Sequence, residues 1–130
     1  MSYYFNTIVS ADFESTKERV IEELKKEGFG VLTEIDIKAT LKKKIDVDFR
    51  KYVILGACNP GFAFKALTAE DKVGTMLPCN VILQELEDGR IEVAAVNPKA
   101  SMQAIENRDL EGIANEVSLK MKRVIEALME

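Results

Sequence analysis

The spacing of apolar positions changes several times along the chain, and each change predicts a new element of secondary structure. Aromatic and β-branched residues predict a first strand at Tyr3–Val9. A 3.6-residue spacing then predicts an amphipathic helix whose apolar side is formed by Phe13, Val20, Ile21 and Leu24. A short strand at Val31–Ile35 and a helix at Lys38–Ile45 follow. The continuous apolar run at Tyr52–Cys58 is typical of a strand covered on both faces.

The second half of the chain contains two Asn-Pro pairs, each directly after a predicted strand. Asn is a favoured helix cap and Pro a favoured first helical residue, so a helix is predicted from Asn59-Pro60 to about Glu70. After Asn97-Pro98, a long last helix is predicted from about Asp109. Its broad apolar stripe comprises Leu110, Ile113, Ala114, Val117, Met121, Val124, Ile125 and Leu128.

Two further strands, Cys79–Glu87 and Arg90–Val96, flank Asp88-Gly89 and predict a β-hairpin. A two-residue turn at Asp88-Gly89 would give the cross-strand pairs Leu86–Ile91, Leu83–Ala94, Val81–Val96 and Asn80–Asn97. The two carboxamides would then lie together at the open end of the hairpin, next to Cys79. This register also places Glu85 opposite Glu92, a mildly destabilising pair of like charges.

The order of these elements predicts an α+β fold. We expect a single domain over residues 1–130, built as a sandwich of a mainly antiparallel sheet with helices packed mostly on one face. The 130-residue length is enough for one hydrophobic core, and 47% hydrophobic with 31% charged residues is a globular balance.

Composition excludes several classes of function. The chain contains no His, which removes the commonest general base and nearly every zinc or haem ligand set. The net charge of −4 argues against a nucleic-acid partner. No apolar stretch approaches the roughly 20 residues of a membrane span, and no secretory signal is recognisable, so we expect a cytoplasmic protein with reduced thiols.

Two cysteine-containing segments are the candidate functional sites, namely Cys58-Asn59-Pro60 and Pro78-Cys79-Asn80. A thiol before a helix N-terminus is favoured as a thiolate, although a small buried core residue is the commoner role of free Cys. An antiparallel arrangement of the two strands would bring Cys58 and Cys79 to one end of the sheet, and we favour it over a parallel crossover. Pro78 is expected to be trans, as a proline that begins a strand.

The chemistry open to two thiols is limited. A structural zinc site needs four ligands, so the two thiols could bind zinc only in a dimer that contributes two from each subunit. Binding of a soft ion such as Cu(I) is the other possibility. The chain also contains a basic cluster, which comprises Lys38, Lys42, Lys43, Lys44, Arg50 and Lys51. Such a cluster is most often a solvated helix face, and its alternative role is an anion site. No glycine-rich phosphate loop is present.

Several motifs together resemble the family catalogued as domain of unknown function 302. They are Gly28–Asp36, Ala39-Thr40-Leu41, Val47–Arg50, Ile54–Pro60, Ala66-Leu67, Leu77–Val81 and Val96-Asn97-Pro98, in the family's order. Asn97 departs from the family, which more often carries Asp at this position. The resemblance implies a compact α+β domain, usually a small bacterial or archaeal cytoplasmic protein, and a homodimer. It implies no established activity and no known cofactor.

Three functions follow as hypotheses. The first is a homodimeric binding module for a small anionic ligand or a soft metal, with Cys58, Asn59, Pro60, Pro78, Cys79, Asn80 and Asn97 as ligand-binding candidates. The second is a thiol-based redox enzyme or relay that uses Cys58 and Cys79 as catalytic thiols. The third is a structural interaction protein that uses the stripe of the last helix. The sequence leaves open whether the protein is an enzyme.

Overall fold

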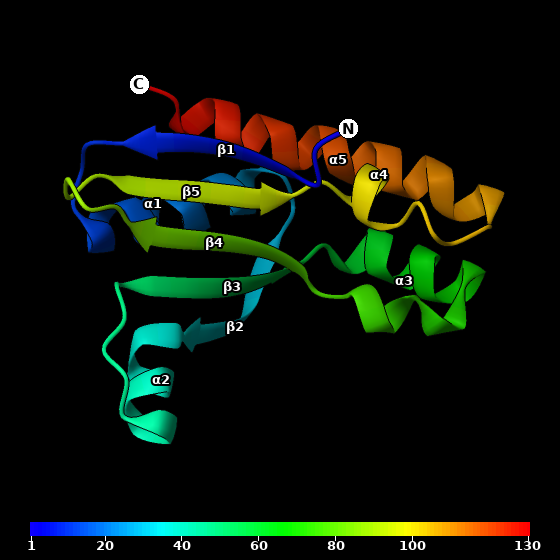
Figure 1. Ribbon diagram of the computed structural model, residues 1–130. Helices are drawn as coiled ribbons and strands as arrows, with labels where there is room; N and C mark the ends of the chain where they lie inside the picture. Colours follow the sequence, from blue (N-terminus) through cyan, green and yellow to red (C-terminus); the bar gives the residue numbers. More distant parts are fainter.

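The computed structural model describes residues 1–130 and contains one five-stranded sheet with helices (Figure 1). The strands are β1 (Tyr4–Val9), β2 (Gly30–Asp36), β3 (Tyr52–Cys58), β4 (Cys79–Glu85) and β5 (Ile91–Val96). They lie in the order β1-β5-β4-β3-β2, and every neighbouring pair is antiparallel. The predicted α+β class and the mainly antiparallel sheet are therefore confirmed.

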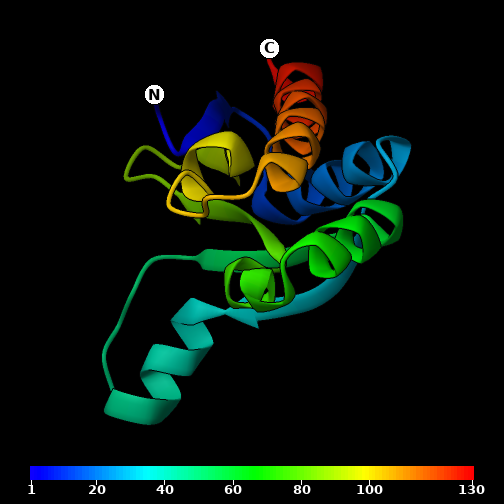
Figure 2. The same cartoon turned by 90° about the vertical axis from the view of Figure 1, so that its right-hand side faces the viewer.

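The helices are α1 (Phe13–Lys26), α2 (Ile37–Ile45), α3 (Pro60–Ala69), α4 (Pro98–Ser101) and α5 (Arg108–Leu128), with a 3-10 helix η1 at Asp71–Met76. Helices α1 and α5 cover one face of the sheet, whereas α2 projects from its edge (Figure 2). The described helices include none with the length and apolar composition that a bilayer span requires.

The core lies between that face of the sheet and the helices α1 and α5. Alternate strand residues supply one side of it, among them Leu55, Leu83 and Val93. The predicted stripes of α1 and α5 supply the other side, and Val20, Leu24, Met121 and Leu128 are fully buried. Most of the α5 stripe is buried within the chain's own core, so it offers little surface for a partner.

The opposite face of the sheet carries no helix, which corrects the prediction that Tyr52–Cys58 is covered on both faces. Val53, Leu55 and Ala57 are buried under the helices, but Tyr52 and Ile54 on the open face are only half-buried. The run is continuous in the sequence because Ile54 lies beside Ile82 of β4 and Ile35 of β2, so the open face shields itself partly with apolar side chains.

The hairpin differs from its prediction by one residue. Leu83 pairs with Val93 and Val81 with Ala95, because the loop contains three residues, Glu87-Asp88-Gly89, instead of two. Gly89 has φ +87°. A three-residue hairpin loop commonly contains one residue in this left-handed conformation. The register change replaces the expected Glu85–Glu92 pair with Gln84–Glu92, in which Gln84 Nε2 donates a hydrogen bond to Glu92 Oε1 over 2.7 Å.

Candidate functional site

The two cysteines lie at the same end of the sheet. Strands β3 and β4 are antiparallel, and Cys79 begins β4 opposite Ala57, the residue before Cys58. Both cysteines are free and half-buried. Burial, followed by the nearby Cys58, raises the pKa of the Cys79 thiol from its ordinary 9.0 to about 11. Cys79 is therefore a protonated thiol at neutral pH.

Both thiols line a cavity of about 310 Å³, which we call the apolar cavity. Its walls are helix α3, with Phe62, Ala63 and Ala66, and helix α5, with Ile113, Ala114 and Val117. Leu67 of α3 also lines the cavity. The rest of the lining comes from the end of the sheet and the connecting segments, namely Phe29, Leu32, Ala57, Cys58, Asn59, Leu77, Pro78, Cys79, Pro98 and Met102. The lining contains no charged side chain, and Asn59 is its one carboxamide.

The local sequence explains why a cavity forms here. Helix α3 begins with Pro60 after the Asn59 cap, as predicted, but its apolar residues do not form a single stripe, and only Ala66 is buried. Ala63, Ala66 and Ala114 have short side chains where the two helices face each other, so space remains between them.

Asn59 has a structural role at the rim of this cavity. Its Oδ1 accepts a hydrogen bond from the backbone N–H of Phe62, and its Nδ2 donates to the carbonyl of Glu27 over 3.3 Å. Gly28, which ends α1 with φ +86°, leaves room for this carboxamide because a Cβ there would lie 2.9 Å from Asn59 Nδ2. Both ends of the Asn59 side chain are thus engaged within the protein.

Pro78 forms part of the cavity wall, and the Leu77–Pro78 peptide bond is cis, so the trans prediction was wrong. The isolated bond prefers trans by only about 0.5–1 kcal/mol, and tertiary packing therefore decides the isomer. The packing partner is Gly56 in β3, where a Cβ would lie 2.7 Å from Pro78 Cγ. Gly56 is the residue that lets the proline approach the sheet.

Three of the predicted site residues do not line the apolar cavity. Pro60 is exposed at the start of α3. Asn80 pairs with Gly56 and lies on the open face of the sheet, in a shallow hollow that Tyr4 and Tyr52 also line. Asn97 is buried and caps α4. The predicted contact between Asn80 and Asn97 is wrong, because the hairpin register is shifted by one residue.

Sequence reasoning missed the helical walls of the cavity. Phe62, Ala66 and Ile113 were assigned to helices but not to a site, since their apolar character alone does not distinguish a cavity wall from a core. One available signal was the composition of α3, in which apolar residues occur on every side of a ten-residue helix. Such a helix lies in the interior or lines an apolar space.

No group of three or more Cys, Asp or Glu side chains gathers anywhere in the structure in an arrangement that could hold a metal ion. A single chain therefore supplies the two thiols at the apolar cavity and no third Cys, Asp or Glu ligand beside them.

These features define an α+β protein with an apolar cavity at one end of an antiparallel sheet. The family described as "Domain of unknown function DUF302" matches residues 5–128, and the chain belongs to this family. It is similar to the crystal structure of an uncharacterized conserved DUF302 protein from Bacillus stearothermophilus, with a TM-score of 0.90 and 28% sequence identity. That match covers 98% of this chain and 99% of the other. A comparison with curated proteins gave no match.

Proposed function

We propose that this protein is a binding module that holds an uncharged apolar group in the apolar cavity. The observation that carries this proposal is the lining itself: a cavity of about 310 Å³ is lined by apolar side chains, two thiols and one carboxamide. Ligand pockets are commonly of about 300–1,000 Å³ and predominantly apolar. The expected anionic ligand finds no cation in this lining, so the group inside the cavity is a neutral one.

Filling the cavity tests the proposal. In Ala63→Leu, the larger side chain enters the space between α3 and α5, and we expect the affinity for 1-octanol, measured by calorimetry, to fall at least about tenfold. Ala127→Leu, at an exposed position near the end of α5, is the matched control and should bind octanol like the unmodified protein.

Either of two results would contradict the proposal. One is that the unmodified protein fails to bind 1-octanol, and the other is that Ala63→Leu binds it with unchanged affinity. Circular dichroism of both variants shows that a loss of binding does not come from a loss of folding. Native mass spectrometry of the purified protein gives an independent reading, because a retained apolar molecule or metal ion would appear as added mass.

The alternative of a thiol-based redox enzyme has one observation in its favour, since both free thiols line the same cavity. The raised pKa of Cys79 weighs against it, because the thiolate is the nucleophile and is scarce at neutral pH. A soft metal would likewise have to displace the proton of this buried thiol. We also propose a cytoplasmic location for the binding module, because both thiols would stay reduced there.

We also propose that the protein is a homodimer in which α2 packs against a second copy. Helix α2 has nine residues and none of them is buried, and its last residue, Ile45, is 63% exposed. A helix this short is marginal in water without tertiary packing. The open sheet face, with Ile8 and Ile35 exposed, offers apolar surface of the kind that a second copy would cover.

Sedimentation equilibrium tests the dimer, and we expect twice the 14.5 kDa chain mass at micromolar concentration. Ile45→Asp places a charge in the proposed interface and should give the single-chain mass. Ala127→Asp introduces the same charge at an exposed site on α5 and should remain dimeric. A single-chain mass for the unmodified protein would rule the dimer out.

A further inference from the structure

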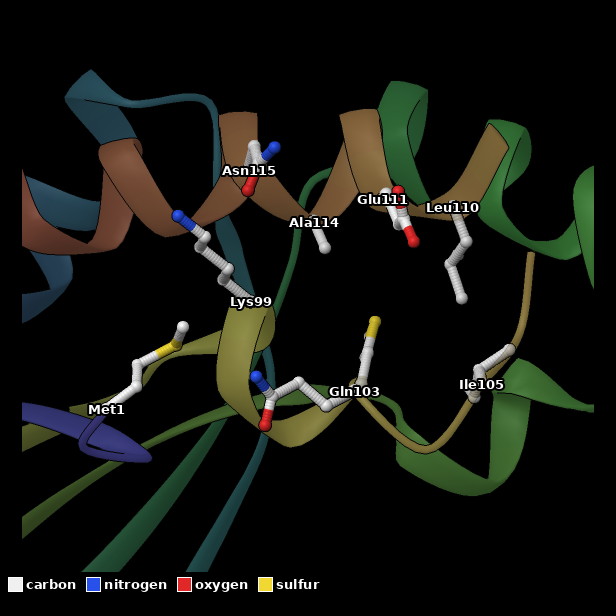
Figure 3. Close-up of a pocket in the computed structure, with 9 residues that line it drawn as sticks. Met1, Lys99, Gln103, Ile105, Leu110, Glu111, Ala114 and Asn115 are labelled. Atoms are coloured by element: carbon white, nitrogen blue, oxygen red, sulfur yellow. The ribbon is translucent and has the colours of Figure 1, made fainter. Parts of the chain in front are cut away.

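A second cavity lies beside the apolar one, between α4 and α5, and has a volume of about 240 Å³ (Figure 3). We call it the polar cavity. Its lining includes the polar residues Lys99, Gln103, Glu111 and Asn115. The apolar cavity has no charged residue, so the two neighbouring spaces differ sharply in chemistry.

The two cavities share two lining residues, Met102 at the end of α4 and Ala114 on α5. Met102 is half-buried, and its unbranched side chain has three rotatable bonds. The two cavities thus meet at Met102 and Ala114, and Met102 is the flexible one of these two residues.

The charges of the polar cavity favour an acidic group. Lys99 is exposed, and none of the salt bridges in the structure involves it. Glu111 lies in the first turn of the 21-residue helix α5, where the positive end of the helix dipole compensates its carboxylate. Among the side chains that line this cavity, Lys99 is thus a cation without an ion-pair partner.

The arrangement of these side chains separates the two charges. In Figure 3, Lys99 extends from α4 toward the turn of α5 that carries Asn115, whereas Glu111 lies one turn nearer the start of α5. A carboxylate beside Lys99 could accept hydrogen bonds from the Lys99 ammonium and the Asn115 amide. It would lie away from Glu111.

We propose that the two cavities form one bipartite site for a linear amphiphile with a carboxylate head. The hydrocarbon chain occupies the apolar cavity, passes Met102 and Ala114, and places its carboxylate beside Lys99 and Asn115. This inference rests on the proposed function, because it assumes that the apolar cavity is occupied, and it adds the chemical class of the ligand.

The test compares dodecanoate with 1-dodecanol, which have the same chain length and differ in head-group charge. Calorimetry below their aggregation concentrations should show that dodecanoate binds about threefold to fivefold more tightly, as for an exposed ion pair. Lys99→Gln should remove this difference and leave the affinity for dodecanol unchanged. Lys122→Gln, which removes the same charge from an exposed position on α5 outside both cavities, should bind both like the unmodified protein.

The outcomes separate the two proposals. If 1-octanol and 1-dodecanol both fail to bind, the proposed function fails and the inference fails with it. If the alcohols bind but dodecanoate has no advantage, or if Lys99→Gln and Lys122→Gln have equal effects, the apolar site stands and the carboxylate head is wrong. Competition between 1-octanol and dodecanoate provides a further check, because a shared apolar cavity requires that each displaces the other.

Discussion

Replacement of Asn97 with alanine is expected to lower the free energy of unfolding by about 3 kcal/mol. Asn97 is 5% exposed, and its Oδ1 accepts hydrogen bonds from Ser118 Oγ over 2.6 Å and from the backbone N–H of Lys99 over 3.2 Å. Its Nδ2 donates to the carbonyl of Ser2 over 3.0 Å. Asn97→Ala removes the α4 cap and leaves the buried Ser118 hydroxyl without this acceptor. Urea unfolding followed by circular dichroism measures the change.

Asn80→Ala is the matched control for this prediction. Asn80 was predicted to share a site with Asn97, but it is exposed on the open face of the sheet, so its replacement should change stability by no more than about 0.5 kcal/mol. Equal effects of the two substitutions would contradict the structural role of Asn97. The same unfolding curves test the predicted single domain, because one cooperative transition is expected for residues 1–130.

Cys79 is expected to react with iodoacetamide at pH 7.5 about a hundredfold more slowly than a thiol with the ordinary pKa, since a rise of two pKa units lowers the thiolate fraction by that factor. The rate should increase with pH until the pH passes about 11, where the thiolate predominates. Mass spectrometry of the alkylated protein over a series of pH values measures both effects.

Two single-cysteine variants make this measurement specific. Cys58→Ser leaves Cys79 as the one thiol, and urea-unfolded Cys58→Ser supplies the reference rate for the same residue without burial. Cys79→Ser isolates Cys58 in the same way. Rapid alkylation of folded Cys58→Ser near neutral pH would contradict the buried, protonated thiol and restore the redox alternative.

The elements of the fold could be predicted from local sequence because each depends on nearby residues. The stripes of α1 and α5 follow the helical period, and Asn59-Pro60 caps a helix that begins where it was expected. Asn97-Pro98 also caps a helix, the short α4, which was not predicted. The hairpin was found, but its register was not. Asp88-Gly89 is compatible with loops of two and of three residues, and the pairing of Gln84 with Glu92 across the strands accompanies the longer loop.

The candidate site was predictable only in part. The sequence predicted that Cys58 and Cys79 lie at one end of the sheet if their strands are antiparallel. The two strands are antiparallel in the structure. The sequence placed Asn97 in the same site, yet a one-residue register change and the buried partner Ser118 give it a structural role. The Leu77–Pro78 bond is cis where trans was expected, and the space for Pro78 depends on Gly56, a residue far away in the sequence.

The sequence by itself determined the periodicities, the caps and the absence of histidine, since these are properties of residues close together in the chain or of composition alone. Tertiary structure alone decided which apolar residues fill the core and which enclose the cavity. Ala66 and Leu77 are far from Ile113 in the sequence, and no local pattern records how closely those segments approach. The space between them exists because short side chains meet where two helices cross, and that meeting is fixed only when the whole chain has packed.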